Sequence, residues 1–252
     1  MNTVIKTDLG RVRQHNEDAV MIVYNQDEIP LFVLADGMGG HQAGDVASSM
    51  TVNFFQEKFS QTKGRFSAKE AEAWLVSAIE ELNEKIYTYS MQNQDCLGMG
   101  TTVVAVSLCQ DQSLTVAHVG DSRAYLLGKD GLIQVTEDHS YVNELVKRGA
   151  LSLKDAQTHP KRNILMRALG TEKTIQVDVQ TISIDEKSCL LICTDGLSGK
   201  ISINEMEDIL HKPLSLEEKS KLLIECANEA GGEDNISVIL VDLTNLQAEG
   251  EQ

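Results

Sequence analysis

Short runs of apolar residues, bounded by polar or glycine-rich turns, recur along the chain and are typical of buried strands. They lie at residues 19–25, 30–36, 100–109, 113–120, 122–128, 175–183, 188–196 and 235–243. A short polar turn separates the first two runs, as in an antiparallel pair of strands. Between the runs, residues 138–170 form a longer region of mixed polar and helical character.

Two segments after the first pair of strands repeat their apolar residues at helical spacing. The first carries Val46, Met50 and Phe54 on one face. The second opens with Ser67 and Glu70 as a capping box. Its apolar stripe then consists of Ala71, Trp74, Leu75, Ala78, Ile79, Leu82 and Ile86. Both segments are predicted to be amphipathic helices.

A third helix is predicted to begin at the capping box of Ser215 and Glu218 and to stop at Gly231 and Gly232. Grouped strands and paired helices favour an α+β fold with antiparallel sheets over a strictly alternating parallel fold. The chain shows no repeat, linker or break in composition. We therefore expect one domain over residues 1–243 and an acidic tail over 244–252.

Composition and charge restrict the possible partners. The 252 residues are 42% hydrophobic, which suits a globular core, and the formal net charge is -16. So acidic a chain is not expected to bind nucleic acid or an anionic membrane, because both need a basic surface. No apolar run is long enough to span a bilayer, and the start lacks a signal-peptide pattern. Five cysteines without a C-x-x-C pair indicate reduced thiols, so we expect a soluble cytoplasmic protein.

Acidic residues stand at the ends of several predicted strands. Asp36 ends one run, Asp121 follows another, Asp195 ends a third and Asp234 precedes the last, while Glu17 and Asp18 precede the first. A sheet can gather side chains from distant segments at its strand ends, and gathered carboxylates repel one another unless a cation neutralises them. Oxygen ligands without histidine or thiolate suit Mg²⁺ or Mn²⁺. The pattern therefore predicts a metal pair.

The segment "LFVLADGMGGHQAGD" (31–45) adds glycines directly after Asp36. A backbone without side chains can approach a metal closely, so the carbonyl of Gly37 could join the coordination shell. The alternative is that each Asp-Gly pair is only a turn, which is the commoner role of this dipeptide. Four such sites in one acidic chain favour the metal pair, although periodicity alone does not show that they converge.

Eight motifs occur in order along almost the whole chain and resemble the metal-dependent Ser/Thr protein phosphatases of the 2C (PPM) family, in its short bacterial form. They are "TDLGRVRQHNED", "LADGMGGHQAGDVAS", "GMGTTVVAV", "AHVGDSRAYLL", "VTEDHSYVNELV", "HPKRNILMRALG", "LLICTDGLS" and "GGEDNISVILV". The resemblance implies a four-layer αββα sandwich, in which two packed antiparallel β-sheets are flanked by helices. It also implies hydrolysis of phosphoserine and phosphothreonine in proteins.

The resemblance further implies two tightly bound Mn²⁺ or Mg²⁺ ions and a weaker third ion. Asp36 matches the carboxylate that bridges the pair, and Gly37 matches the residue whose carbonyl binds one ion. Asp195 and Asp234 match the other ligands of the second ion. Asp121 matches the acid that holds the third ion together with Asp195. A water between the paired ions is then the expected nucleophile.

Three further residues receive roles from the same resemblance, and the proton donor stays open. Glu17 and Asp18 match acids that lie near the metal pair and act mainly through water. Arg13 matches the guanidinium that grips the substrate phosphate, for which its planar fork is suited. Some members carry a histidine directly after the Asp-Gly pair, where this chain has Met38. The proton donor is therefore either His41, three residues further on, or water on the metal.

The family also carries a mobile flap, which corresponds to residues 138–169 here and where we expect substrate selection. The implied partners are Ser/Thr-phosphorylated proteins and an opposing bacterial Ser/Thr kinase, and a monomer is expected. A nucleotide-binding module is a weak alternative, because Gln42 interrupts G-x-G-x-x-G and Ile201 follows Gly199-Lys200. An inactive relative is disfavoured because the four strand-end aspartates are intact.

Overall fold

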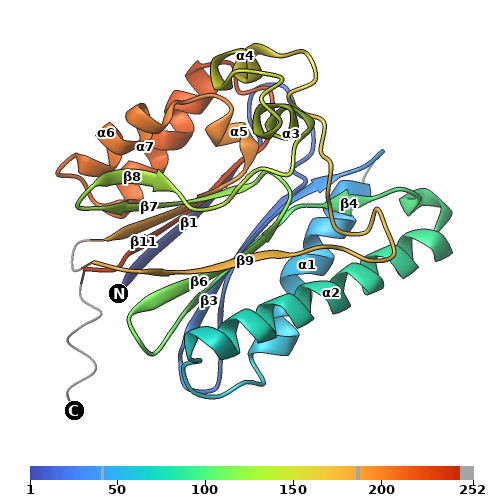
Figure 1. Ribbon diagram of the computed structural model, residues 1–252, viewed down its shortest axis with the longest axis horizontal. Coiled ribbons are helices and arrows are strands. Elements are labelled where there is room, and N and C mark those ends of the chain that lie inside the picture. The colour runs from blue at the N-terminus through green and yellow to red at the C-terminus, as the bar shows by residue number, and fades with distance from the viewer. Residues whose placement is uncertain (41–42, 186–187, 245–252) are drawn as a thin grey trace.

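The computed structural model describes residues 1–40, 43–185 and 188–244, and within them the chain forms two antiparallel sheets that pack face to face (Figure 1). The first sheet is ordered β1 (Asn2–Asp8), β11 (Ile236–Asp242), β10 (Cys189–Cys193), β7 (Arg123–Gly128) and β8 (Gly131–Gln134). Each neighbouring pair is antiparallel.

The second sheet is ordered β2 (Asp18–Tyr24), β3 (Pro30–Met38), β5 (Val103–Leu108), β6 (Ser113–Val119) and β9 (Asp178–Ser183). The short strand β4 (Gly100–Thr101) pairs with the end of β3. In the second sheet, too, every neighbouring pair of strands is antiparallel. This arrangement excludes the parallel strand–helix–strand unit of a nucleotide-binding module, because the neighbours of β3 run opposite to it.

Helices cover the outer face of each sheet. The long helices α1 (Ala43–Phe59) and α2 (Ala68–Gln92) pack on the second sheet, with the turn η1 (Gln94–Cys96) after them. On the first sheet lie α5 (Asp195–Ser198), α6 (Ile203–His211) and α7 (Leu216–Glu229). The predicted α+β fold, a four-layer αββα sandwich, is confirmed.

The alternating side chains of the strands build three layers of core. On β3, Phe32 and Leu34 point between the sheets, whereas Leu31 and Val33 point toward α1 and α2. On β10, Ile192 likewise faces the other sheet while its neighbours face the helices. Because both faces of these strands are buried, they read as continuous apolar runs in the sequence.

The capping boxes that the sequence predicts are present at Ser67 with Glu70 and at Ser215 with Glu218. Two of the acids that were predicted to end strands stand elsewhere. β10 stops at Cys193, so Asp195 opens the short helix α5 instead. Asp36 does not end β3, which continues through Gly37 to Met38 because those two residues pair with β4. The Asp36 side chain therefore projects from within a strand, which fixes its backbone on both sides.

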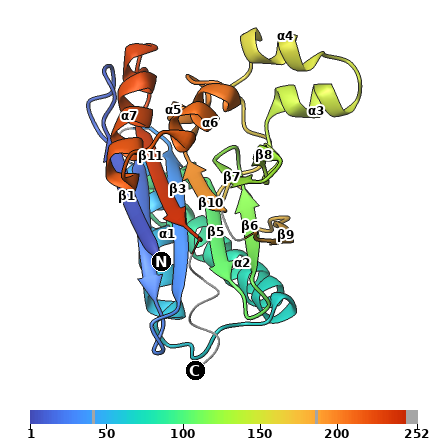
Figure 2. The same ribbon diagram turned by 90° about the vertical axis from the view of Figure 1, so that its left-hand side faces the viewer.

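The predicted flap contains two short helices, α3 (Tyr141–Lys147) and α4 (Leu153–Thr158). Figure 2 shows both standing away from the sheets, beyond the ends of the strands. Across the described ranges 1–40, 43–185 and 188–244, no helix combines the length and apolar character that crossing a membrane requires.

Candidate active site

The predicted acids converge from both sheets at one end of the sandwich. Asp18 opens β2 and lies directly opposite Asp36 on β3 in the strand register. In the other sheet, Asp195 stands two residues beyond the end of β10, at the start of α5, and Asp234 stands two residues before β11, the antiparallel neighbour of β10. The hydroxyl of Thr194 donates to Asp18 Oδ2 over 3.0 Å and links the two groups across the sheets.

These carboxylates perturb one another because they are buried and close together. Burial and then the charges of Asp18 and Asp195 raise the pKa of Asp36 well above its usual range. Burial is also the largest cause of the upward pKa shifts of two further acids. It raises the pKa of Asp18 to about 7 and that of Asp195 to about 6. Without a cation, this cluster therefore holds carboxyl groups that resist ionisation near neutral pH.

Two carboxylate oxygens at the cluster are buried without a hydrogen-bond partner among the described residues. They are Oε1 of Glu17 and Oδ1 of Asp18. Leaving such an atom unsatisfied is costly, so orphaned acceptors that face a group of acids fit a bound cation. All the acids offer hard oxygen donors, which Mg²⁺ and Mn²⁺ prefer. The donor set thus fits the metals that the sequence predicts.

The glycines beside Asp36 allow β3 and the start of α1 to pack closely around Glu17. A Cβ on Gly37 would lie 2.1 Å from the carbonyl oxygen of Gly44, and one on Gly44 would lie 2.5 Å from Glu17 Oε1. The amide of Gly37 also donates to the carbonyl of Glu17 over 3.0 Å. Any side chain at Gly37 or Gly44 would displace an atom of the site.

Arg13 reaches the same cluster from the loop after β1. Its Nη2 donates to Asp234 Oδ2 over 2.8 Å, and both side chains are partly exposed. Burial lowers the pKa of Arg13. The negative charges of Asp234, Glu17 and Asp36 together outweigh that effect, so the pKa is raised overall. The guanidinium is thus a permanent cation at the exposed edge of the acid cluster.

Asp121 lies deeper, in the turn between β6 and β7, and is only 9% exposed. Burial and then the charge of Asp195 raise its pKa to about 8. Nearby, Arg123 donates to both carboxylate oxygens of Asp138 over 2.9 and 2.6 Å. The charge of Arg123 opposes the upward pKa shifts of Asp121 and Asp195.

Sequence reasoning missed this partly buried pair of Arg123 and Asp138. The signal was present, because the two residues stand within the motifs "GDSR" and "TEDHS". A cavity of about 760 Å³ opens beside them, between the flap and α5–α6. Its lining includes Asp121 and Asp195 together with the cations Arg162 and Lys200. The acid cluster is therefore reached through a cleft that one side of the flap forms.

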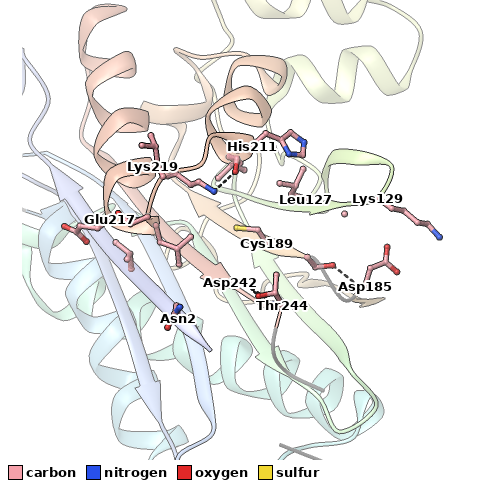
Figure 3. A pocket seen from close by; sticks show the side chains of 17 residues that line it. Asn2, Leu127, Lys129, Asp185, Cys189, His211, Glu217, Lys219, Asp242 and Thr244 are labelled. Carbon is pink, nitrogen blue, oxygen red and sulfur yellow. Dashed lines mark hydrogen bonds between the residues drawn. The ribbon is translucent and has the colours of Figure 1, made fainter. Parts of the chain in front are cut away.

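A larger cavity, of about 1040 Å³, lies at the opposite end of the first sheet (Figure 3). Cys189 and Asp242 line it, and these residues face each other at the ends of β10 and β11 farthest from Asp195 and Asp234. Its charged residues are of both signs, with Lys129 and Lys219 near Asp185 and Glu217. No predicted metal ligand lines this cavity. His41 lies outside the described residues.

Comparison with known proteins agrees with this geometry. The family model described as protein phosphatase 2C matches residues 10–240. The serine/threonine phosphatase Stp of Listeria innocua is 45% identical over 98% of both chains. The crystal structure of Stp1 from Staphylococcus aureus matches with a TM-score of 0.90 and 36% identity, over 96% of this chain and 94% of that one.

The catalytic domain of the phosphatase PstP, solved in complex with two manganese ions, matches with a TM-score of 0.82 and 32% identity, over 96% of this chain and 97% of that one. The chain therefore belongs to the protein phosphatase 2C family. It is a protein serine/threonine phosphatase.

Proposed function

We propose that this phosphatase hydrolyses phosphoserine and phosphothreonine with two Mn²⁺ or Mg²⁺ ions held by the acid cluster. The observation that carries the proposal is the burial of acids from both sheets in one place, with raised pKa values and two orphaned carboxylate oxygens. The related PstP domain, solved with two manganese ions, supports it. Bound there, such ions would lower the pKa of a water between them and so supply the nucleophile.

The residues nearest the strand ends would be the direct ligands. Asp36, fixed within β3 and buried among the other acids, is suited to bind both ions. The carbonyl of Gly37 would contribute beside it, because Gly37 directly follows Asp36 along β3. Asp195 and Asp234 would complete the second site from the other sheet. Asp121 would hold a third, weaker ion together with Asp195, whose charge already acts on it.

The remaining residues would position water and substrate. Glu17 and Asp18, each with one orphaned carboxylate oxygen, would act mainly through water. Arg13 would exchange its contact with Asp234 for the substrate phosphate, which its fork can bind through two hydrogen bonds. His41 or a water would protonate the leaving alkoxide.

The proposed function also bears on how substrates are selected and on which partners the protein has. The flap borders the cleft with Arg162 and Asn163, so we propose that it selects among phosphoproteins. The opposing partner would be a Ser/Thr kinase, because a phosphatase needs an enzyme that supplies its substrate. We also propose a cytoplasmic monomer that binds neither nucleic acid nor membrane, in accord with the net charge of -16.

The test is hydrolysis of a phosphothreonine peptide by chelator-treated protein, with and without added Mn²⁺. Asp36→Ala, Asp195→Ala and Asp234→Ala should each lose at least ~100-fold in kcat, since even residues behind the ligands cost ~10–100-fold. Asp208→Ala is the matched control, because it removes the same charge from the exposed face of α6. A variant that keeps its kcat at saturating Mn²⁺ would lose its place as a ligand.

A further inference from the structure

Both ends of the flap meet at a single carboxylate outside the acid cluster. Asp178, the first residue of β9, accepts a hydrogen bond from Arg167 Nη1 over 2.7 Å through Oδ1. Its Oδ2 lies 3.2 Å from Nε2 of His139. His139 stands at the start of the flap and Arg167 near its end, and the amide of Met166 donates to the carbonyl of His139 over 2.7 Å. Asp178 therefore sits where the flap is attached to the sheet.

His139 connects this point to the turn that carries Asp121. The amide of Gly120 donates to His139 Nδ1 over 3.0 Å, and the amide of His139 donates to the carbonyl of Gly120 over 2.9 Å. Gly120 has a φ of +110°, and a Cβ there would meet Thr102 Cγ2 at 2.6 Å. Glycine is therefore required next to Asp121, and its peptide is held on both sides by one histidine.

The contacts of His139 determine which ring nitrogen carries the proton. The ring is buried, with 1% of the side chain exposed, and stacks on His118 with 4.7 Å between ring centroids. Burial, then the neighbouring His118 and Arg167, lower its pKa to about 4, so the ring is neutral near neutral pH. Because Nδ1 accepts from Gly120, Nε2 must carry the hydrogen.

This tautomer also decides whether His139 and Asp178, together with His118, bind a metal or act through hydrogen bonds. His118, His139 and Asp178 place one ligand atom each within 4.8 Å of one another, as a metal site would. A metal at Nε2 would need that nitrogen's lone pair, which would put the hydrogen on Nδ1, facing the amide hydrogen of Gly120. Nε2 lies 3.2 Å from Asp178 Oδ2 without the alignment of a hydrogen bond, and it has no hydrogen-bond partner among the described residues, so the negative charge of Asp178 is what favours a hydrogen on Nε2.

We propose that Asp178 is a positioning residue for Asp121 and for the flap. Its carboxylate favours the His139 tautomer that accepts from Gly120, and the same carboxylate holds the end of the flap through Arg167. The series of contacts from Asp178 to His139 and from His139 to Gly120 thereby sets the direction of the Asp121 side chain. This inference rests on the proposed role of Asp121 at a third, weaker metal site.

The first test is Asp178→Asn, which keeps the shape of the side chain and removes the charge. An amide cannot accept from Arg167 and also present a negatively charged oxygen to His139, because it is neutral and one of its two ends is a donor. The Mn²⁺ concentration for half-maximal activity should rise about tenfold, as when a partner behind a metal ligand is lost. Calorimetry should still find two tightly bound Mn²⁺ ions. Asp208→Asn, on the exposed face of α6, should match the wild type.

The second test needs no metal. In chelator-treated protein, Asp178→Asn should speed hydrogen exchange at the Gly120 amide, and ¹⁵N NMR should show His139 losing its Nε2–H tautomer. A lowered melting temperature with an unchanged Mn²⁺ activation curve, Gly120 exchange and tautomer would reduce Asp178 to a stabilising residue and overturn the proposal.

A double-mutant cycle tests whether Asp178 acts through His139. His139→Asn keeps an acceptor near the Nδ1 position and removes Nε2. In that background Asp178→Asn should shift the Mn²⁺ activation curve no further, whereas fully additive shifts would overturn the proposed route. Asp121→Ala separates the two hypotheses. If it leaves the activation curve unchanged, the third site itself is wrong. If it shifts the curve and Asp178→Asn does not, only the positioning role is wrong.

Discussion

The acid cluster predicts that replacing a carboxylate by an amide should stabilise the metal-free protein. Asp121 is the sharpest case, because burial and the charge of Asp195 raise its pKa from 3.8 to about 8. In the unfolded chain this carboxyl ionises near pH 4, whereas in the folded chain it stays protonated until about pH 8. The folded state thus binds more protons over that interval, so its stability falls as pH rises.

The size of the effect follows from the same pKa. Between pH 6 and pH 8, Asp121 should cost the folded state about 2 kcal/mol, at about 1.4 kcal/mol for each pKa unit. Asp121→Asn removes this group and leaves the other titrating residues in place. Among them are His118 and His139, whose pKa values are lowered in the folded protein. Both histidines therefore make the folded state more stable as the pH rises and the unfolded chain loses its histidine protons. Their contributions cancel between the two proteins.

The assay is thermal unfolding of wild type and Asp121→Asn in excess chelator at pH 6 and pH 8 and equal ionic strength. The melting temperature of the variant relative to wild type should rise by about 4–8 °C between the two pH values, given about 2–4 °C for each kcal/mol in a chain of this size. With saturating Mn²⁺ the advantage should shrink or reverse, because ligands bind metal only when deprotonated. Parallel pH profiles of the two proteins in chelator would refute the reasoning.

Three further substitutions probe separate parts of the site. Arg13→Ala should raise KM for a phosphopeptide and weaken inhibition by free phosphate, and a calorimetric loss of Mn²⁺ affinity with unaltered KM would contradict that role. Gly44→Ala would push its methyl group onto Glu17 Oε1, so denaturant unfolding should show a loss of about 1–3 kcal/mol together with weaker Mn²⁺ binding; an unchanged Mn²⁺ affinity would argue against Glu17. Arg123→Ala leaves Asp138 without its bidentate partner and should cost about 3 kcal/mol in the same assay, whereas a loss below 1 kcal/mol would show that water replaces the pair.

Elements with both faces buried could be predicted from the sequence, and weakly patterned ones could not. The core strands β3, β5 and β10 are continuous apolar runs because cores lie on both sides of them. The edge strand β1 (Asn2–Asp8) alternates with exposed polar residues, and β8 is short, so neither was predicted. Helix α6 was also missed, although Ser202 and Glu205 form the same capping box as the two helices that were predicted.

The candidate site shows where local sequence stops being informative. The acids could be found because strand ends and glycines mark them, but their convergence depends on pairing between distant segments. The register that sets Asp18 against Asp36 and the pairing of β10 with β11 are examples. The burial of His139 could not be predicted either, because its stacking on His118 and its bonds to Gly120 arise only when the flap folds back on β6.

The position of the acids between the sheets links the proposed chemistry to the cohesion of the fold. Asp18 and Asp36 belong to the second sheet, while Asp195 and Asp234 lie just beyond the ends of β10 and β11 in the first. Their mutual repulsion therefore acts across the packing face that Phe32 and Ile192 help to fill. A cation held by acids from both sheets would turn that repulsion into attraction. If the ions bind as proposed, their binding would also hold the two sheets together. A loss of packing at this face should then weaken metal affinity without touching a ligand.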